Sequence, residues 1–233
     1  MSELFSKITN KIEKHKKKRK KRRFEARRER DRKKIRNRDF TIISNNCWGG
    51  HAYRYFDRSY SSPTVGLYFP YEHYVKFVYN LRYYMSLDLK FIPWRESPYV
   101  EELRYCGRGD VPVGVLDDVH IIFLHYKTEE EAYEKWNRRR ERMNFDNIII
   151  KFSNLGPASE DVLKKFSELP FNNKFLVINR KKKDAKYPCE VEWKGYVGPH
   201  GDALDTENFP GNLNLRKLLD LPPERYPEEG YVW

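Results

Sequence analysis

Apolar residues along this chain gather into short continuous runs, and these runs alternate with longer stretches in which apolar residues recur every three or four positions. Runs of about four to eight apolar residues bounded by turn residues are typical of buried strands. The runs predict strands at residues 41–44, 119–126, 147–152 and 174–179, and a turn that feeds a further buried strand within residues 61–70.

The stretches with helical spacing predict amphipathic helices that lie against a sheet. They cover residues 51–56, 71–87, 129–143, 159 or 160 to 169, and 212–221. The start of the third helix is marked most clearly, because Thr128 followed by three glutamates forms a capping box.

Strands that alternate with helices predict an α/β fold with a mostly parallel sheet and helices on both faces, a Rossmann-like three-layer arrangement. The run at 119–126 is apolar on both faces, so we expect it to be a central strand of the sheet. Residues 93–112 contain three prolines and two glycines, which predicts a long loop of the kind that often carries function.

The positive charge of the chain is confined to its N-terminus. Of 46 Lys and Arg residues, 19 lie in residues 1–38 against 5 acids, which leaves 27 against 29 in residues 39–233. This difference predicts a basic helical arm at 1–38 and a single α/β domain at 39–233.

The arm begins with four apolar residues at helical spacing, Leu4, Phe5, Ile8 and Ile12, and continues into a cationic tract at 16–23. This order is typical of a segment that lies on an anionic membrane surface. A solvated helical tail explains the same charges without a partner. Nucleic-acid binding is less favoured, because the nearly neutral domain offers no basic face that continues the tract.

The three cysteines, Cys47, Cys106 and Cys189, follow neither a zinc-site nor a disulfide pattern, which favours a reducing compartment. No apolar run approaches the roughly 20 residues of a membrane span. The basic N-terminus also lacks the apolar core and cleavage site of a signal peptide. We expect a cytoplasmic protein, peripheral on the inner face of the cell membrane if the arm binds lipid.

The loop after the first strand is the most informative stretch of the chain. Asn45 and Asn46 tolerate left-handed backbone angles, and Gly49 and Gly50 let a ligand approach the backbone closely or open a helix with free N–H groups. Because ligands of parallel α/β sheets bind at the carboxyl ends of the strands, these four residues are candidate substrate-binding residues.

Cys47 lies between these two pairs, where free N–H groups would lower the pKa of its thiol and stabilise an oxyanion. His51, His120 or His125 is then a candidate base, since histidine titrates near neutral pH. We favour His125, which is expected at the end of a strand beside the Cys47 loop, and for His120 we favour a core position. A buried, inert cysteine is the alternative.

No metal site is expected. His120 and His125 are an odd number of residues apart, so in a regular strand they point to opposite faces. Asp117 and Asp118 complete this polar cluster and are candidate substrate-binding residues. The chain also lacks a Walker loop, a Gly-x-Gly-x-x-Gly turn, a His-Glu-x-x-His helix and a Gly-x-Ser-x-Gly elbow, which excludes the enzyme classes built on them.

The arginines around Trp136 form a third candidate group. One that shares the stripe of Trp136, such as Arg139, is turned inward and needs an anion. Together with Arg142 and Asn144 it is a candidate contact for the phosphate of a nucleotide sugar or of coenzyme A. An ion pair with one of the two aspartates named above explains the same pattern without a ligand.

Several stretches, taken in order, resemble one bacterial family, a domain of unknown function found in capsule and exopolysaccharide biosynthesis proteins. They are Ser44-Asn45-Asn46-Cys47-Trp48-Gly49-Gly50, Ser62-Pro63-Thr64-Val65, Val111-Pro112-Val113-Gly114 with Asp117-Asp118, Phe123-Leu124-His125-Tyr126, Glu130-Glu131-Ala132 to Trp136, and Arg139 to Asn144. The resemblance covers about residues 40–180 and leaves the arm outside. It implies an α/β domain that works in surface-polysaccharide assembly, with sugar or acyl transfer as the expected activity.

A second resemblance is to polysaccharide-biosynthesis acyltransferases in which a strand ends in Gly-Asn-Cys-Gln. Asn46-Cys47 is similar to the middle of that motif, whereas Asn45 replaces the glycine and Trp48 the glutamine. The similarity implies an acyl transfer at Cys47.

The favoured hypothesis is a transferase that moves an acyl or glycosyl group to a polysaccharide precursor. Acetyl-coenzyme A or a nucleotide sugar is the expected donor, and no tightly bound cofactor is expected. The alternative is a non-catalytic module that binds glycan or docks on the biosynthetic machinery through its arm. Nucleic-acid binding through the arm is a third hypothesis, with an affinity that falls steeply with salt.

Overall fold

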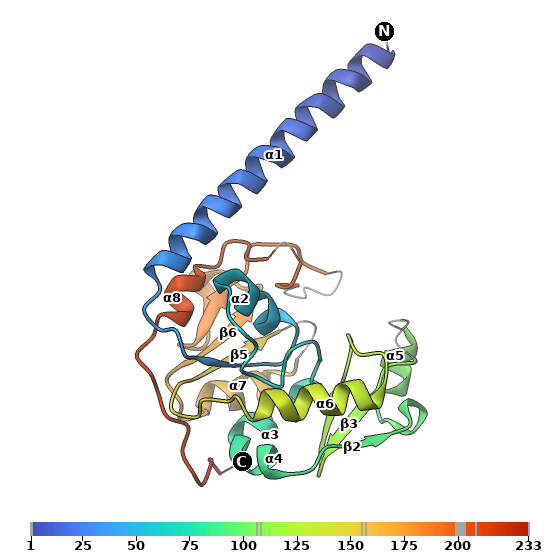
Figure 1. Ribbon diagram of the computed structural model, residues 1–233, viewed down its shortest axis with the longest axis vertical. Coiled ribbons are helices and arrows are strands. Elements are labelled where there is room, and N and C mark those ends of the chain that lie inside the picture. Colours follow the sequence, from blue (N-terminus) through green and yellow to red (C-terminus); the bar gives the residue numbers. More distant parts are fainter. Residues whose placement is uncertain are drawn as a thin grey trace.

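The computed structural model describes residues 2–105, 107, 109–154, 156, 158–198, 204–207 and 209–232, with side chains from Asn10 onward except those of residues 102 and 105. A four-stranded sheet forms the centre of the body, and a long N-terminal helix, α1 (Ser2–Lys34), projects from it (Figure 1). The described part of the chain is therefore an α/β fold with a helical extension, as the alternation of runs predicted.

The central sheet is parallel throughout. Its strands are β1 (Thr41–Ser44), β5 (Ile148–Ser153), β6 (Lys174–Ile178) and β7 (Glu190–Glu192), in the spatial order β1-β5-β6-β7. All three pairings are parallel, so the carboxyl ends of the strands meet at one edge of the sheet. The predicted strands at 41–44, 147–152 and 174–179 are confirmed.

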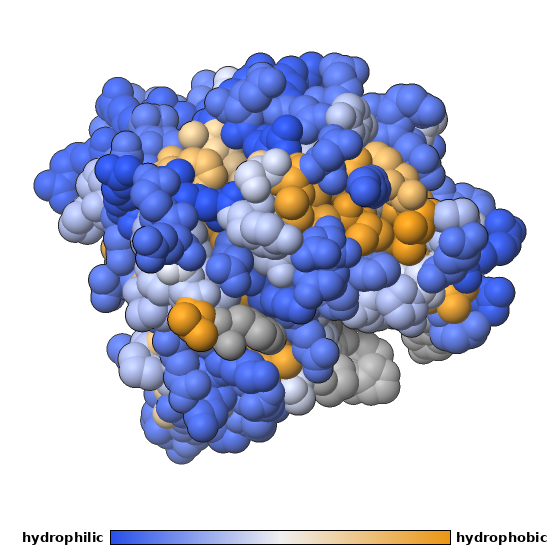
Figure 2. Space-filling model, turned by 90° about the horizontal axis from the view of Figure 1, so that it is seen from below, coloured by the Kyte–Doolittle hydropathy of each residue, from blue (hydrophilic) through white to orange (hydrophobic). Residues whose placement is uncertain are grey.

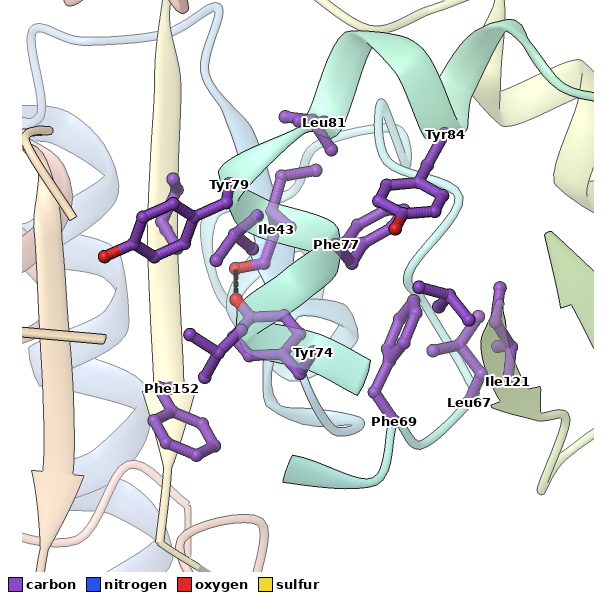
Figure 3. Close-up of a cluster of buried hydrophobic side chains, with 14 of the residues drawn as sticks. Ile43, Leu67, Phe69, Tyr74, Phe77, Tyr79, Leu81, Tyr84, Ile121 and Phe152 are labelled. Carbon is purple, nitrogen blue, oxygen red and sulfur yellow. Dashed lines mark hydrogen bonds between the residues drawn. The ribbon is translucent and has the colours of Figure 1, made fainter. Parts of the chain in front are cut away.

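Helices cover both faces of this sheet. One face packs on α3 (Tyr71–Tyr79) and α7 (Glu160–Glu168). Tyr74 of α3 lies beside Phe152 of β5 (Figure 3), and Phe166 of α7 packs on the same ring. The other face packs on α2 (Trp48–Phe56) and α8 (Leu215–Leu219) in a separate apolar cluster. The three-layer arrangement is confirmed, and α2 contains the predicted helix at 51–56.

Hydroxyl groups saturate the outer edge of β1. The backbone N–H of Ile42 donates to Tyr53 Oη at 2.9 Å, and that of Ser44 donates to Thr64 Oγ1 at 3.1 Å. The Thr64 hydroxyl lies 3.4 Å from the carbonyl oxygen of Ile42. Because side chains from α2 and the following loop satisfy these backbone groups, β1 is the last strand on this side of the sheet in the described part of the chain.

The run at 119–126 is not a central strand, and this prediction was wrong. It forms β4 (Val119–Ile122), at one edge of a small antiparallel sheet with β2 (Lys90–Ile92) and β3 (Val113–Leu116) in the order β2-β3-β4. Its two faces are apolar because this sheet lies between the main core and a cluster around Leu103 of α5. Burial from both sides, rather than a central place, explains the pattern.

Two further predictions for the middle of the chain were wrong. Residues 61–70 form no strand; Tyr68 makes only an isolated antiparallel bridge with Ile122. Residues 93–112 are not one long loop, because they contain a 3-10 turn (Trp94–Glu96) and α5 (Val100–Tyr105).

The helix predicted at 71–87 is interrupted at Asn80, which separates α3 from α4 (Leu81–Ser86). The hydroxyl of Tyr226 lies at the break, 2.7 Å from the carbonyl oxygen of Tyr79 and 3.1 Å from the N–H of Leu81. A hydroxyl from a distant part of the chain thus replaces the helical hydrogen bonds at this point, which no local spacing reveals.

The capping box is confirmed at the start of α6 (Glu129–Arg140), where Thr128 accepts a hydrogen bond from the N–H of Glu131. The helix ends three residues before the predicted Met143. The predicted helix at 212–221 is confirmed only at its centre, as α8, and α7 confirms the helix expected to end at 169.

The last third of α1 packs against α2. Phe24 meets the ring of Tyr55 edge-on at 5.8 Å, Tyr55 Oη donates to Asp31 at 2.8 Å, and Arg32 Nε donates to the carbonyl oxygen of Tyr55 at 2.6 Å. The segment that precedes Phe24 extends away from the body (Figure 1). The division into an arm and one domain at residue 38 stays a prediction.

The face opposite α1 is mostly hydrophilic, with hydrophobic residues gathered in patches between hydrophilic ones (Figure 2). Within the described part of the chain, no helix combines the length and the apolar character that crossing a bilayer requires.

Candidate functional site

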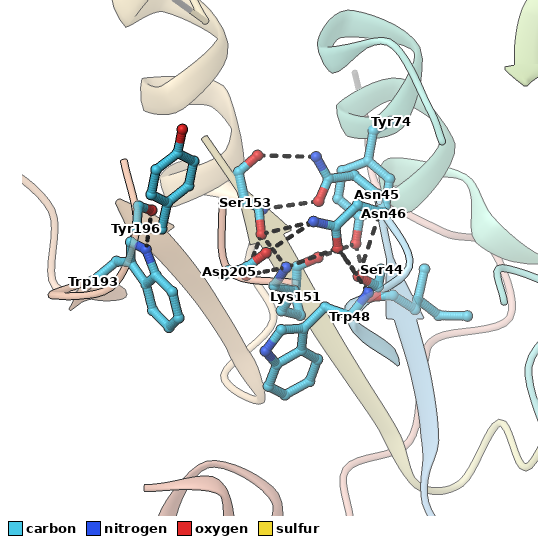
Figure 4. Close-up of polar contacts among 11 residues, drawn as sticks. Ser44, Asn45, Asn46, Trp48, Tyr74, Lys151, Ser153, Trp193, Tyr196 and Asp205 are labelled. Carbon is cyan, nitrogen blue, oxygen red and sulfur yellow. Dashed lines mark hydrogen bonds and ion pairs between the residues drawn. The ribbon is translucent and has the colours of Figure 1, made fainter. Parts of the chain in front are cut away.

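The floor of the candidate site is the face of β5 that looks toward α2. Side chains alternate along a strand, so Ile149, Lys151 and Ser153 share this face, while Ile150 and Phe152 point to the opposite core. Lys151 and Ser153 therefore lie at the carboxyl end of the parallel sheet, beside Ser44 of β1 (Figure 4).

Lys151 is completely buried and forms an ion pair with the equally buried Asp205, with 2.6 Å between Nζ and Oδ2. The second partner of this carboxylate oxygen is Ser153 Oγ, which donates to it at 2.5 Å. Burial lowers the pKa of the Lys151 ammonium to about 8, against the attraction of Asp205. The lysine therefore stays charged at neutral pH and is held by a full set of partners.

Asn45 and Asn46 connect this ion pair to the loop that carries Cys47. Asn46 Nδ2 donates to Asp205 Oδ1 at 3.0 Å, and Asn46 Oδ1 accepts from Lys151 Nζ at 3.0 Å (Figure 4). Asn45 forms two hydrogen bonds with the backbone of Ser153. Both amides are buried and position the loop.

An open cleft of about 360 Å³ adjoins this buried cluster on the side of Cys47. It lies between the start of α2, the loop at 60–66, the loop after β4, and α6. The residues that line it are Cys47, Gly50, His51, Arg54, Tyr60, Val65, Gly66, His125, Tyr126, Lys135 and Arg139. The structure thus brings together Cys47, His51, His125, Gly50 and Arg139, all predicted from the sequence as site residues.

Positive charge dominates this cleft. Arg54, Lys135 and Arg139 line it, and no Asp or Glu does so among the described residues. Arg139 is 8% exposed; it donates to the carbonyl oxygen of Val65 at 2.9 Å and to Tyr126 Oη at 2.5 Å, and its guanidinium lies 5.0 Å from the ring centroid of Tyr60. The expected ion pair with Asp117 or Asp118 is absent from the described contacts of Arg139.

His51 is the fourth residue of α2, and its surroundings favour the neutral imidazole. Burial lowers its pKa, and the guanidinium of Arg54 lowers the pKa further. Arg54 Nη2 lies 3.1 Å from His51 Nδ1. Because a guanidinium can only donate, Nδ1 is the acceptor and the ring proton of the neutral His51 is on Nε2.

His125 lines the cleft with Cys47, as predicted, but from a different element. It lies in the loop after β4, where its backbone N–H donates to the carbonyl oxygen of Gly66 at 3.1 Å, rather than at the end of a parallel strand. Gly66 has φ = +84°, which a side chain rarely adopts. This turn brings the loop at 60–66 against His125.

Cys47 occupies the N-cap position of α2, directly after the buried Asn46. Its Sγ is 3.9 Å from the carbonyl oxygen of Leu67. A charged group lies in its environment, because Lys151 interacts electrostatically with it. A half-buried thiol at a helix start within reach of cations can serve as a nucleophile.

The two glycines act through packing. A Cβ on Gly49 would contact Ile42 and Ser44 of β1 at about 3.5 Å, and a Cβ on Gly50 would lie 2.9 Å from Val65 Cγ1. The small residues let the first turn of α2 lie directly on β1, which places Cys47 and His51 at the mouth of the cleft.

The remaining predicted site residues do not line the cleft. Asp117 and Asp118 form the turn between β3 and β4, where Asp117 accepts from Tyr83 and Asp118 from Tyr84. Arg142 is exposed just past α6.

Asn144 binds Asp39 and Thr41 at the amino end of β1, away from the carboxyl ends that form the site. His120 packs beside His73 with 5.2 Å between ring centroids, and burial lowers its pKa. Cys106 lies outside the described residues. Cys189 is not among the residues that line the cleft, and burial raises the pKa of its thiol.

Sequence reasoning missed Lys151 and Asp205. A signal for Lys151 was present, because a single lysine inside the apolar run at 148–152 must be buried and needs a partner. Asp205 carries no comparable signal, since it lies in irregular chain far from Lys151 in sequence. No group of three or more His, Cys, Asp or Glu suited to a metal ion occurs among the described residues.

Chemically, the cleft combines a thiol, two imidazoles and three cationic side chains beside a rigid, fully paired buried cluster. Such a set can bind a phosphate or another anion and can move a proton near neutral pH.

Comparison with known proteins gives two matches. The model of a family described as a domain of unknown function, DUF1919, matches residues 16–200. An uncharacterized protein of Haemophilus influenzae is 31% identical over 148 residues, which is 64% of this chain and 66% of the relative, so the chain spans slightly less than two thirds of that protein.

Neither description names a reaction, a substrate or a polysaccharide, and the expected link to polysaccharide assembly stays a prediction. The match also begins inside the arm, at residue 16, so the expectation that the arm lies outside the family was wrong for residues 16–38. Because the family model covers more than half of the sequence, the chain belongs to the DUF1919 family.

Proposed function

We propose that this protein is a transferase that moves an acyl or glycosyl group from a phosphate-bearing donor to a carbohydrate, in the making of an exopolysaccharide or capsular polysaccharide. The donor is acetyl-coenzyme A or a nucleotide sugar, and it binds in the cleft beside Cys47. The carbohydrate link comes from the resemblance of the sequence, and the donor class comes from the charges in the cleft.

One observation carries the donor class. Arg139 is a buried residue that lines the cleft, yet the described hydrogen-bond partners of its guanidinium are the carbonyl oxygen of Val65 and the hydroxyl of Tyr126, both neutral. Arg54 and Lys135 line the same cleft. Lys135 is already paired with Glu131, whereas Arg54 and Arg139 have no carboxylate partner among the described residues, and a di-anionic phosphate group would supply the missing negative charge.

The other cleft residues then take the following roles. In acetyl transfer, Cys47 attacks the thioester carbon, coenzyme A leaves as its thiol, and a sugar hydroxyl takes the acetyl group from Cys47 while His125 accepts the hydroxyl proton. In glycosyl transfer a sugar hydroxyl attacks the anomeric carbon of the donor and the nucleotide leaves, while His125 accepts the hydroxyl proton and Cys47 is a binding residue. In both reactions Asn45 and Asn46 position the loop that carries Cys47. His51 binds substrate at the mouth of the cleft.

To test the proposal, the purified protein is titrated with UDP, UDP-N-acetylglucosamine, coenzyme A and acetyl-coenzyme A. Binding is measured by the change in thermal stability and by calorimetry. A donor present at a hundred times its dissociation constant adds about 2.7 kcal/mol to the stability of the native state. We expect one donor class to bind.

Two adjacent arginines of α6 provide the matched variants. Arg139→Gln should weaken binding of that donor at least tenfold, whereas Arg138→Gln should not, because Arg138 is exposed and paired with Glu134 outside the cleft. Absence of binding by all four compounds, or equal weakening by both variants, would contradict the proposal.

A second candidate function is a non-catalytic module that docks on the membrane-bound machinery. It is favoured by α1, whose described residues between Asn10 and Arg23 are exposed and, apart from Asn10, Ile12, Glu13 and His15, all lysine or arginine. Such a segment is attracted to anionic lipid by about 1 kcal/mol per cation near the surface.

Sedimentation with phosphatidylglycerol vesicles tests this module. Replacement of Lys16, Lys17, Lys18, Lys20 and Lys21 by glutamine should abolish co-sedimentation at 0.1 M salt, and phosphatidylcholine vesicles should bind neither form. If the wild-type protein stays in solution with both kinds of vesicle, the membrane role of α1 is disproved.

A further inference from the structure

A second cleft, of about 420 Å³, adjoins the one beside Cys47. The two share His51 and Arg54, which therefore stand between them. The remaining residues that line the second cleft are Phe24, Arg28, Tyr55, Thr206 and Phe209. Together the clefts form one continuous surface from α6, across the start of α2, to α1.

The N-terminal helix forms one wall of this second cleft. Phe24 and Arg28 lie one turn apart on α1, and the packing of Phe24 on Tyr55 and the hydrogen bond from Tyr55 Oη to Asp31 fix their position. Arg32 adds two hydrogen bonds to backbone carbonyls at the end of α2. This part of α1 is thus a fixed part of the cleft.

The second cleft, like the first, carries more positive than negative charge. Arg28 and Arg54 line it, and neither pairs with a carboxylate among the described residues. The guanidinium of Arg28 lies 5.8 Å from the ring centroid of Phe24, and Arg54 donates to Tyr60 Oη at 3.1 Å. Both keep donors for a further anion, since a guanidinium carries five N–H groups.

Aromatic rings supply the rest of the surface. Phe209 is tilted against His51 with 5.3 Å between centroids, and its ring meets Tyr55 edge-on at 6.1 Å. With Phe24 these rings offer apolar faces beside the two arginines. A pyranose ring that carries an acidic group matches this surface, because its C–H face packs on aromatic carbon while its anionic substituent binds arginine.

We infer that the second cleft is the acceptor subsite, and that it takes a sugar bearing a carboxylate or a phosphate. The assignment as an acceptor rests on the proposed transferase function, whereas the binding of an acidic sugar does not. The donor and the acceptor then meet at His51 and Arg54, and α1 contributes directly to substrate binding through Phe24 and Arg28.

The full-length protein is titrated by calorimetry with three probes: glucuronic acid, glucose 1-phosphate and glucose. We expect at least one of the two acidic sugars to bind and neutral glucose not to bind at the same concentration. Binding of glucuronic acid alone identifies a uronic acid as the acceptor class, and binding of glucose 1-phosphate alone identifies a sugar phosphate.

The deciding variants lie on one helix. Arg28→Gln should weaken binding of the acidic sugar at least tenfold, and Arg30→Gln should leave it unchanged, because Arg30 is exposed and lies outside the cleft. Phe209→Leu, which keeps an apolar side chain, should weaken binding of the same probe as a second, independent variant.

Absence of binding by both acids, equal binding of glucose, or equal effects of Arg28→Gln and Arg30→Gln would overturn the inference. The experiments distinguish failure of this inference from failure of the proposed function. If the donors bind and the acidic sugars do not, only the acceptor subsite is lost. If the acidic sugars bind and no donor does, the transferase is lost and a sugar-binding cleft remains.

Discussion

Two groups of cations lie at the carboxyl edge of the central sheet, and they differ in how their charges are balanced. Lys151 is wholly buried and is matched by Asp205 at 2.6 Å. Arg139 and Arg54 line an adjacent cleft and have no carboxylate partner among the described residues, whereas Lys135, which also lines it, pairs with Glu131 of the same helix. The buried lysine is satisfied within the chain, whereas the cleft cations are only partly so.

This difference distinguishes a charged group that stabilises the fold from charged groups that can bind a ligand. A buried ion without a counter-ion is strongly unfavourable, so the chain must supply Asp205 for Lys151 to be tolerated. A cation in contact with solvent can stay unpaired at small cost and keep its donors for a ligand. We therefore expect the loss of a charge to lower the free energy of unfolding strongly in the first group, and to weaken ligand binding in the second.

The largest effect is expected at Asp205. Asp205→Asn leaves the ammonium of Lys151 in a dry environment without a counter-ion, so the free energy of unfolding should fall by about 3–5 kcal/mol. Urea denaturation at pH 7 measures it. The control is Asp161→Asn, which removes an exposed partner of Lys165 and should change stability by less than about 0.5 kcal/mol. A loss at Asp205 as small as that of the control would refute the structural role.

Lys151 itself should make stability depend on pH. Burial lowers the pKa of its ammonium to about 8, so between pH 8 and about 10.4 the unfolded chain keeps a proton that the native protein has lost. The stability of the wild type relative to Lys151→Met should therefore rise with pH in that window, by up to about 1.4 kcal/mol per pH unit. Denaturation series from pH 7 to 10 measure this difference, and a flat or falling difference would contradict the burial of the charged lysine.

Arg139 should contribute less to stability than to binding. Arg139→Gln removes hydrogen bonds to Val65 and Tyr126, which should cost about 1–2 kcal/mol. Arg138→Gln provides the comparison and should be neutral within about 0.5 kcal/mol. Chemical denaturation of both proteins without ligand gives these values. A cost at Arg139 near that at Asp205 would make it a structural residue and erase the distinction between the two groups.

The smallest effect is expected at Arg54, whose side chain is exposed and whose loss relieves repulsion in the cleft. Arg54→Gln should change the free energy of unfolding by less than about 0.5 kcal/mol while weakening the binding of the donor that the wild type prefers. Denaturation and calorimetry on the same preparation separate the two results. Unaltered donor affinity in a stable Arg54→Gln protein would place the phosphate elsewhere.

The parts of the fold that follow from local pattern could be predicted. The β-branched run before Asn45 and the capping box at Thr128 each form the expected element, because short-range sequence decides both. The loop at 44–51 could be predicted as a site because it follows a strand, and ligands of parallel α/β sheets bind where the carboxyl ends of the strands meet. Cys47, His51 and Arg139 do line one cleft there.

The errors have one physical origin, which is contact between distant segments. The Tyr226 hydroxyl interrupts the helix at Asn80, and the main core covers a strand that is not central. His125 reaches the cleft through a turn at Gly66 rather than through the sheet. Burial can be inferred from sequence at such places, but the partner that causes it cannot.

The hydroxyl-saturated edge of β1 has a further consequence for the behaviour of the protein at high concentration. A free strand edge is a template on which another chain can add a strand and begin aggregation. On the β1 side that template is already occupied by Tyr53 and Thr64, and on the other side the last strand of the described sheet is only three residues long. Hydroxyl groups thereby close the β1 margin to growth, and the β7 margin offers only three residues as a template.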